Sequence, residues 1–202
     1  MFDLILRKLK DDIFNPLTQR LLWIHPSIIT ITGLAAGFVC AFFLYAGDYI
    51  SGFLFWIFNR ILDGLDGAVA RAGGKESDLG GYIDIVADFA VYAIVPIALA
   101  LEKGDLNLFI ALSCMLAAFY VNAASWMYLS AVLEKRNAVN GGSQGKTAVV
   151  MPAGIVAGTE TLIIYSIFIL FHEHAFIIFN ITTGLVLFTI LQRLIWGVKN
   201  LK

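Results

Sequence analysis

The chain has 202 residues, of which 59% are hydrophobic and 14% are charged, and its formal net charge is -1. A soluble domain of this length carries about 25% charged residues. Because the apolar residues also come in long blocks, the composition excludes an ordinary soluble domain and predicts an integral membrane protein. The near-neutral charge, with no basic face that interleaves aromatic residues, indicates no nucleic-acid partner.

The first segment, residues 1–24, interleaves apolar side chains with Lys and Asp. This pattern predicts an interfacial amphipathic helix that lies on the membrane surface. A connector helix packed against the rest of the protein explains the same pattern equally well. The segment does not resemble a signal peptide, because charges interrupt it and no small-residue cleavage site follows.

Six apolar stretches follow, each of them long enough to cross the hydrocarbon core. They cover residues 28–46, 50–71, 80–101, 106–132, 147–171 and 175–196. We therefore expect an all-α integral membrane protein with one domain over 1–202, formed by the interfacial helix 1–24 and a six-helix bundle over 25–202. Two small-residue pairs, Gly33–Gly37 and Gly154–Gly158, allow close helix packing, which we expect within the chain rather than at a dimer seam.

Positive charge is distributed unevenly about these stretches. Thirteen Lys and Arg residues fall in the N-terminal tail, the connection after the second stretch, the loop after the fourth and the C-terminal end. On the other side lies only Lys103. The positive-inside rule then places both termini in the cytoplasm, as expected for a protein of a bacterial inner membrane.

Four aspartates interrupt the second and third stretches at helical spacing. In "DGLDGAVAR" (63–71), Asp63, Asp66, Gly67, Ala70 and Arg71 share one helix face. On the next predicted helix the same holds for a second set, Gly80, Asp84 and Asp88. The connection between the two helices is short and polar, so we expect antiparallel neighbours whose acidic faces meet near the cytoplasmic end.

Four carboxylates in one place repel each other and lose part of their hydration. Cations that neutralise them compensate both costs. Hard oxygen ligands favour Mg²⁺, Mn²⁺ or Ca²⁺, and a pair of such ions commonly binds phosphate oxygens. Gly67 and Gly80 leave room beside the acids, and Arg71 offers a forked donor for phosphate. The pattern therefore indicates a metal-bound diphosphate. In the alternative, the aspartates pair with Arg60 and Arg71 and only fix helix packing.

The eight residues resemble the D-x2-D-G-x2-A-R-x8-G-x3-D-x3-D motif of the CDP-alcohol phosphatidyltransferase family and fill each of its fixed positions. The resemblance implies a membrane enzyme, by analogy a homodimer, that binds CDP-diacylglycerol with two divalent cations, Mg²⁺ or Mn²⁺. In such enzymes a small polar alcohol attacks the lipid-side phosphorus and CMP leaves. The active site would face the cytoplasm, with the lipid tails in the membrane.

The resemblance also assigns roles to individual residues. Asp63, Asp66 and Asp84 would be metal ligands, and Asp88 would be the catalytic base on the acceptor hydroxyl and would also contact metal. The CDP pocket would be lined by Gly67, Ala70, Arg71 and Gly80, together with Ser77 and Thr30, which stand at family Ser/Thr positions. Ser27 departs from the pattern, because the family commonly has Asn there.

The sequence does not identify the acceptor alcohol. We expect glycerol 3-phosphate, because cytoplasmic cations are available to bind its phosphate: Lys135, Arg136, Lys146 and Arg193. Ordinary positive-inside charge explains the same residues. Glu160, well inside the fifth stretch, either lines an acceptor cavity or hydrogen-bonds to neighbouring helices. Inositol phosphate, serine and a free polyol are alternative acceptors.

Two other functions are compatible with acids in membrane helices. An aspartate-rich membrane prenyltransferase also binds a diphosphate, but it needs a second acidic motif, and beyond residue 134 the acids are Glu160 and Glu173 alone. A divalent-cation transporter usually places its site near the membrane midplane. The acids here lie at one end of their helices, which favours the phosphatidyltransferase.

Overall fold

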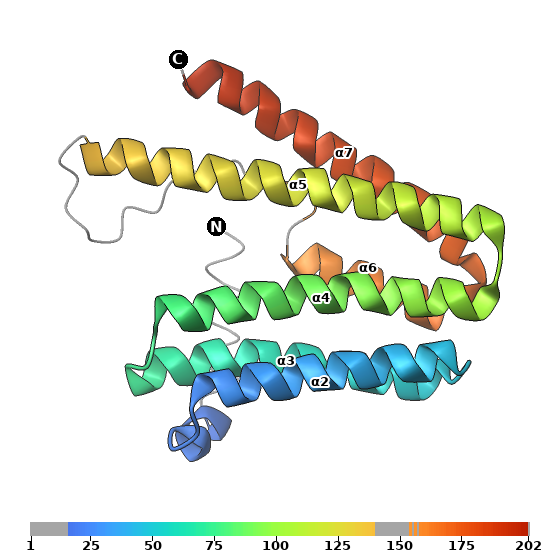
Figure 1. The fold of residues 1–202 in the computed structure, drawn as a ribbon, viewed down its shortest axis with the longest axis horizontal. Coiled ribbons are helices and arrows are strands. Elements are labelled where there is room, and N and C mark those ends of the chain that lie inside the picture. Colours follow the sequence, from blue (N-terminus) through green and yellow to red (C-terminus); the bar gives the residue numbers. More distant parts are fainter. Residues whose placement is uncertain (1–15, 140–153, 155, 157, 202) are drawn as a thin grey trace. The chain divides into compact units, whose positions relative to one another are not determined.

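The computed structural model describes residues 16–139, 154, 156 and 158–201, and every regular element in these ranges is helical (Figure 1). The chain divides into two units, residues 1–103 and 104–202, and each is described by itself. The prediction of an all-helical chain is confirmed for the described part. Most of the predicted interfacial helix, residues 1–15, lies outside it.

The first unit contains a short helix at 16–21 followed by α2 (Pro26–Tyr45), α3 (Tyr49–Gly73) and α4 (Asp78–Lys103). Local signals set the helix ends. His25 caps α2 by accepting a hydrogen bond from the Ser27 amide, and Pro26 occupies the first turn, where its missing N–H costs nothing. The Asp48 carboxylate caps α3 in the same way, and Gly74, at φ 61°, ends it in the left-handed conformation that glycine favours.

Helix α2 packs closely against both α3 and α4, whereas α3 and α4 make few close backbone approaches to each other. The two glycines of α2 explain this arrangement. A Cβ on Gly37 would overlap the Val91 side chain of α4, and a Cβ on Gly33 would lie 3.4 Å from the Leu62 Cβ of α3. The small-residue pair of α2 therefore acts within the chain, as predicted, with one glycine facing each neighbouring helix.

The second unit contains α5 (Leu106–Val139), α6 (Gly158–Leu170), the 3₁₀ turn η1 (His172–His174) and α7 (Ala175–Asn200). Helix α5 packs on α7 around a core that includes Ala118, Val186 and Ile190. Gly154 approaches Thr189 of α7 so closely that a Cβ would overlap its side chain, so this glycine also serves packing within the chain.

Helix α6 begins later than the sequence predicts. The apolar stretch 147–171 predicts one helix with Glu160 well inside it, but the described helix begins at Gly158 and Glu160 lies exposed in its first turn. Val156 lies outside the helix, and its amide donates to the Thr189 hydroxyl over 3.2 Å. The interior position predicted for Glu160 is therefore wrong, because a tertiary hydrogen bond to α7 replaces a helical one.

Within the described part of the chain, four segments are long and apolar enough to cross a membrane: α2, α4, residues 106–136 of α5, and η1 with α7. With 25 residues α3 is also long enough, but its arginines and aspartates make it too polar for that criterion, and α6, with 13 residues, is shorter than a span. The helices thus suit a membrane protein. The number of six spans stays a prediction.

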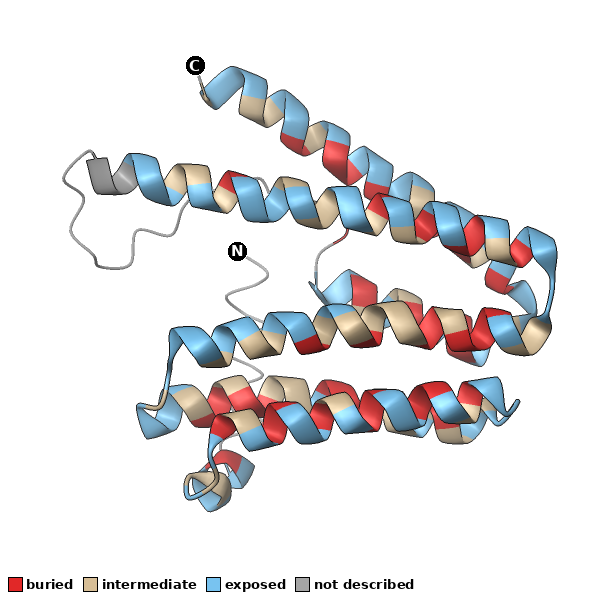
Figure 2. Cartoon of the chain, viewed as in Figure 1, coloured by how far each residue is buried: buried red, intermediate tan, exposed pale blue. Residues whose placement is uncertain are grey.

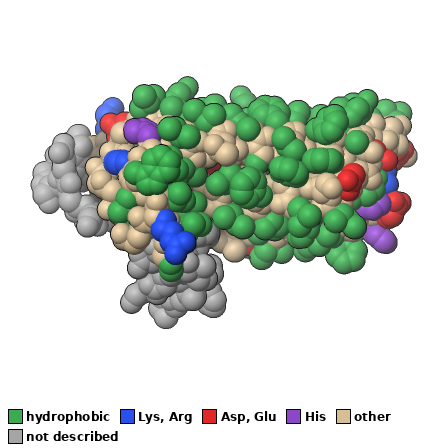
Figure 3. Space-filling view, turned by 90° about the horizontal axis from the view of Figure 1, so that it is seen from below, with side chains coloured by type: hydrophobic (Ala, Val, Ile, Leu, Met, Phe, Trp, Pro, Cys, Tyr) green, Lys and Arg blue, Asp and Glu red, His purple; other side chains and the backbone are tan. Residues whose placement is uncertain are grey.

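Many large apolar residues are exposed rather than buried in a core, and Figure 2 marks exposed residues in pale blue along the helices. Phe42 is 65% exposed, Ile50 is 74% exposed and Leu54 is 62% exposed. On the face drawn in Figure 3, hydrophobic side chains cover most of the surface. Lipid-facing surfaces have this character, since apolar side chains there lose nothing by exposure to hydrocarbon.

Candidate active site

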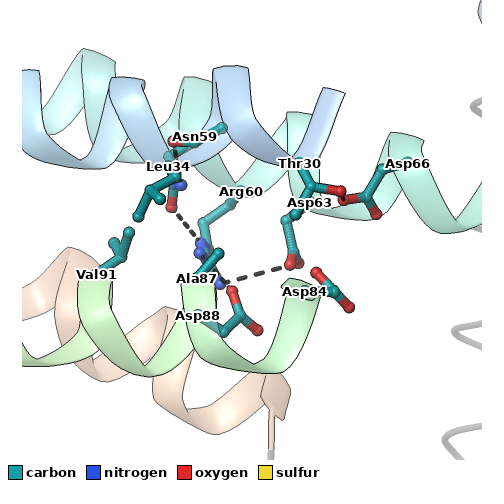
Figure 4. Close-up of a pocket in the computed structure, with 11 residues that line it drawn as sticks. Thr30, Leu34, Asn59, Arg60, Asp63, Asp66, Asp84, Ala87, Asp88 and Val91 are labelled. Atoms are coloured by element: carbon teal, nitrogen blue, oxygen red, sulfur yellow. Dashed lines mark hydrogen bonds and ion pairs between the residues drawn. The ribbon is translucent and has the colours of Figure 1, made fainter. Parts of the chain in front are cut away.

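The four aspartates line one cavity between α3 and α4, which we call the acid cavity (Figure 4). Asp63 and Asp66 come from α3 and Asp84 and Asp88 from α4, so the two predicted acidic faces do face each other. The cavity has a volume of about 10 Å³, which is room for about one water-sized body. Its other lining residues are Thr30, Gly33, Leu34, Asn59, Arg60, Ala87 and Val91.

Asp66 is the most enclosed of the four, with 3% of its surface exposed. The Thr30 hydroxyl of α2 donates to Asp66 Oδ2 over 2.6 Å. A carboxylate buried this deeply needs such a donor, because burial removes the water that would otherwise solvate it. Thr30 therefore ties the first acidic face to α2.

Arg60, four residues after Trp56 on α3, lies between Asp63 and Asp88. Its Nη2 donates to Asp88 Oδ1 over 2.9 Å, and its Nη1 is 3.8 Å from Asp63 Oδ2. Arg60 therefore does pair with aspartates, as expected from the alternative in which the aspartates only fix helix packing. That alternative accounts for two of the four carboxylates, and it does not explain the cavity that all four line.

The acid cavity suits divalent cations by the chemistry of its donors and by its size. Carboxylate oxygens are the ligands that Mg²⁺ and Mn²⁺ prefer, and the space matches a small ion. Among the described residues, no three His, Cys, Asp or Glu side chains are grouped closely enough to hold one ion as they stand. Binding thus requires side-chain rotations that bring acids of both helices onto a shared ion.

A second cavity of about 190 Å³, the rim cavity, adjoins the acid cavity, and Thr30, Asp66 and Asp84 line both. All six residues that the sequence analysis assigns to CDP binding lie around the rim cavity: Thr30, Gly67, Ala70, Arg71, Ser77 and Gly80. Residues from α2, α3, α4 and the α3–α4 connection thus meet at one place, although they are up to 50 positions apart in sequence.

The glycines of the rim cavity make room for protein side chains as well as for a ligand. A Cβ on Gly67 would lie 3.1 Å from Arg71 Nη1, so Gly67 lets the Arg71 guanidinium lie beside α3. The Ser77 hydroxyl accepts a hydrogen bond from the Gly80 amide over 3.1 Å, which is the geometry of a helix N-cap. Ser77 therefore starts α4, besides lining the cavity.

The wall of the rim cavity also includes residues that the sequence analysis did not assign to CDP binding: His25, Pro26, Ser27, Lys75, Glu76 and Gly81. Lys75 Nζ donates to the backbone oxygen of Leu22 over 2.6 Å and also approaches that of Ile24 at 3.4 Å. It thereby joins the α3–α4 connection to the segment before α2. No local pattern signals this contact, because its acceptors are backbone atoms about 50 residues away.

Asn59 and Tyr92 are also absent from the predicted set, and both contact Arg60. A usable signal is present in the sequence, since Asn59 and Arg60 precede Asp63 by four and three residues and Tyr92 follows Asp88 by four. At these spacings side chains share a helix face. The acidic faces therefore continue by one turn toward the middle of α3 and α4.

The predicted acceptor residues belong to the second unit and are not gathered into one described site. Lys135 is exposed, and Arg136 donates to the backbone oxygens of Asn200 and Leu201 at the end of α7. Arg193 is buried on α7, where its Nη1 donates to the backbone oxygen and side-chain oxygen of Asn122. Lys146 lies outside the described residues.

Comparisons with known proteins agree with this geometry. The family model described as CDP-alcohol phosphatidyltransferase matches residues 23–191. The inner membrane protein YnjF of Escherichia coli (strain K12) is 34% identical over 148 residues, which cover 73% of this chain and 70% of that protein. The phosphatidylinositol phosphate synthase of Mycobacteroides abscessus is 36% identical over 125 residues, which cover 57% of this chain and 56% of the synthase.

Among solved structures, the phosphatidylinositol phosphate synthase of Mycobacterium tuberculosis with CDP-DAG bound is similar in fold. The TM-score is 0.69 at 24% identity, and the match covers 91% of this chain and 92% of the synthase. The family match extends over most of the chain and includes both acidic faces and the residues of the rim cavity. The chain is therefore a membrane phosphotransferase and belongs to the CDP-alcohol phosphatidyltransferase family.

Proposed function

We propose that this enzyme transfers a phosphatidyl group from CDP-diacylglycerol to an alcohol and releases CMP. The observation that carries the proposal is the wall that the two cavities share. Thr30, Asp66 and Asp84 line both of them, so a diphosphate can reach from the rim cavity to the acids. Family membership favours this reaction over prenyl transfer and over cation transport.

The donor would bind with its nucleotide in the rim cavity and its diphosphate beside Asp66 and Asp84. Arg71, on the exposed side of the rim cavity, offers two parallel donors to a phosphate oxygen pair. Asp63, Asp66 and Asp84 would hold the divalent cations, which supply charge neutralisation for the diphosphate and for the departing CMP. Mg²⁺ and Mn²⁺ both suit these oxygen ligands.

Asp88 would act on the acceptor. Its carboxylate takes the proton of the acceptor hydroxyl while the hydroxyl oxygen forms a bond to the lipid-side phosphorus. The bond from that phosphorus to the bridging oxygen breaks, and its electron pair leaves with CMP. Asp88 is partly exposed, which leaves it accessible to a small polar molecule.

The acceptor in this proposal is a phosphorylated alcohol. Inositol phosphate is the first to test and glycerol 3-phosphate the second, because a relative that is 36% identical is named for phosphatidylinositol phosphate synthesis. Arg193 adds support, since arginines buried in membrane helices commonly mark binding sites. Its Nε is buried and has no hydrogen-bond partner among the described residues. Lys135, Arg136, Lys146 and Glu160 are further candidates.

The proposal includes the sidedness and the assembly of the enzyme. The active site and both termini face the cytoplasm, which the concentration of Lys and Arg in the tails and loops on that side supports. The enzyme is a homodimer by analogy with its family. Cysteine labelling from either side of the membrane and the mass of the purified protein in detergent test these two statements.

The main test incubates purified protein with CDP-diacylglycerol, Mg²⁺ or Mn²⁺, and a panel of acceptors: inositol phosphate, glycerol 3-phosphate, serine and free polyols. CMP release and the mass of the lipid product are followed together. We expect a phosphatidylated product and an equal amount of CMP, and neither after chelation of the metal. Absence of CMP release with every acceptor, from protein that remains folded, would contradict the proposal.

A further inference from the structure

Arg60 is a buried cation whose position is fixed from several directions. Its side chain is 5% exposed, and its Nε donates to Asn59 Oδ1 over 2.7 Å. Asn59 in turn donates from Nδ2 to the backbone oxygen of Gly33 on α2 over 2.8 Å. The guanidinium carbon lies 5.0 Å from the Trp56 ring centre and 4.9 Å from that of Tyr92. Two rings and one amide therefore hold the guanidinium in one place.

The same guanidinium reaches from α3 to α4. Its Nη1 donates to the Tyr92 hydroxyl over 2.8 Å, and its Nη2 donates to Asp88 Oδ1 over 2.9 Å. Since α3 and α4 make few close backbone approaches, side chains set the separation of their acidic faces at this level. The planar fork of an arginine suits this task, because its donors diverge at fixed angles.

The contact with Asp88 uses only one of the two carboxylate oxygens, Oδ1. Figure 4 shows Asp88 beside the acid cavity, with Arg60 above it and Asp63 and Asp84 nearby. A hydrogen bond to one oxygen limits rotation of the carboxylate and so fixes the direction of the other oxygen. A base must be held in this way, since small displacements of a reacting group lower the rate steeply.

Arg60 also provides positive charge where the acids of the two helices come together. It contacts Asp63 of α3 and Asp88 of α4 at once. Partly buried carboxylates near each other repel, and removal of the cation that they share leaves uncompensated charge. Divalent cations relieve that repulsion when they bind, so the need for Arg60 as a counter-charge is greatest without metal.

We propose that Arg60 is a positioning residue, which holds the Asp88 carboxylate for catalysis and balances the charge of Asp63 and Asp88 before divalent cations bind. The inference rests on the proposed function in one respect, the role of Asp88 as base. The sequence motif does not include this role of Arg60, because Arg60 lies outside the eight motif positions. Asn59, Trp56 and Tyr92 act by fixing Arg60.

Three substitutions separate the parts of this inference. Arg60→Lys keeps the charge and loses the planar fork, and Arg60→Gln loses both. Tyr92→Phe keeps the ring that packs on Arg60 and removes the hydroxyl that accepts from Nη1. Arg20→Lys is the matched control, since Arg20 is exposed on the short helix 16–21 and lines neither cavity.

For catalysis we expect a loss of kcat without a loss of donor binding. Arg60→Lys and Arg60→Gln should lower kcat by about 100-fold, while the KM for CDP-diacylglycerol changes by less than about threefold. Tyr92→Phe should lower kcat by about 10-fold, because the ring still supports the guanidinium. A kcat within about threefold of wild type in both Arg60 variants would overturn the positioning role.

The charge-balancing role is measured without turnover, by thermal unfolding of the purified protein with and without Mn²⁺. Arg60→Gln should lower the metal-free Tm, and Mn²⁺ should raise its Tm by more than it raises that of wild type. Arg60→Lys should respond to Mn²⁺ as wild type does. An equal Mn²⁺ response in all variants would overturn charge balancing, and the positioning role would then stand or fall on kcat alone.

The two proposals fail in different ways. If wild-type protein releases no CMP with any acceptor, the proposed function fails, and the Mn²⁺ response still tests charge balancing by Arg60. If wild type is active and the Arg60 variants lose donor binding and kcat in parallel, the proposed function stands and the positioning role is wrong.

Discussion

The Thr30 hydroxyl of α2 donates to Asp66 of α3 over 2.6 Å, and this contact lies where the acid cavity and the rim cavity meet. The hydrogen bond therefore has two consequences. It compensates the burial of Asp66, and it fixes one wall that both cavities share. The charged groups of the site thus depend on an uncharged hydroxyl from a third helix.

We expect Thr30→Val, which preserves shape and removes the hydroxyl, to leave Asp66 without its donor. The loss should lower the free energy of unfolding by about 1–3 kcal/mol. The kcat/KM for CDP-diacylglycerol should fall by about 10-fold or more, because Asp66 is then free to turn away from the ligand. Thr32→Val is the control, since the exposed Thr32 hydroxyl donates only to the backbone of its own helix at Ile28. Equal effects of the two substitutions would contradict the role of Thr30.

Asp88→Asn should abolish headgroup transfer while CDP-diacylglycerol binding stays measurable. An amide cannot accept the proton of the acceptor hydroxyl, and loss of a general base costs about 10²–10⁴-fold in rate. Product formation by mass spectrometry and binding of labelled CDP-diacylglycerol are the two measurements. Asp78→Asn, at the exposed start of the same helix, should behave as wild type. Full activity in Asp88→Asn would exclude Asp88 as the base.

Enlarging Gly37 should disturb the acid cavity from a distance. A Cβ at this position overlaps the Val91 side chain, so Gly37→Ala should push α4 away from α2 and lower both Tm and kcat. The double variant Gly37→Ala with Val91→Ala restores the space and should recover part of both. Gly184→Ala, where a Cβ meets open space, is the control. If the double variant is no better than the single one, the clash is not the cause.

Lys75→Met should weaken donor binding more than it slows the chemical step. The substitution keeps the length of the side chain and removes the hydrogen bonds to the Leu22 and Ile24 backbone oxygens that join two walls of the rim cavity. The KM for CDP-diacylglycerol should rise by about 5- to 10-fold with kcat within about twofold. Lys199→Met, on the exposed end of α7, is the matched control. A fall in kcat alone would show that Lys75 acts elsewhere in the reaction.

The helices and the acidic faces could be predicted from the sequence because both depend on local order. Apolar length predicts α2 to α5 and α7, and the spacing of three and four residues places Asp63 with Asp66 and Asp84 with Asp88. Glycines and caps then explain where α3 ends and α4 begins. The family resemblance assigns six residues of the rim cavity to CDP binding, and four of them, Gly67, Ala70, Arg71 and Gly80, also share the helical spacing of the aspartates.

The remaining features depend on contacts between distant segments. Arg60 was considered only as a packing partner, because spacing on α3 does not reveal that its guanidinium reaches Tyr92 and Asp88 on α4. The late start of α6 has the same origin, since the Val156 amide pairs with a side chain 33 residues away. Lys75 is a third case, in which the acceptors are backbone atoms without a sequence pattern.

Both acid-bearing helices pack on α2 rather than on each other, and this has a consequence for how the enzyme tolerates mutation. The spacing of the two acidic faces therefore depends on the volumes of uncharged α2 residues such as Gly33 and Gly37, as well as on the Arg60 contacts that bridge α3 and α4. A saturation scan of α2 should therefore find active-site sensitivity along the side facing α3 and α4, and tolerance on the lipid-facing side. A substitution can therefore alter the catalytic geometry without replacing a charged residue or a metal-binding residue.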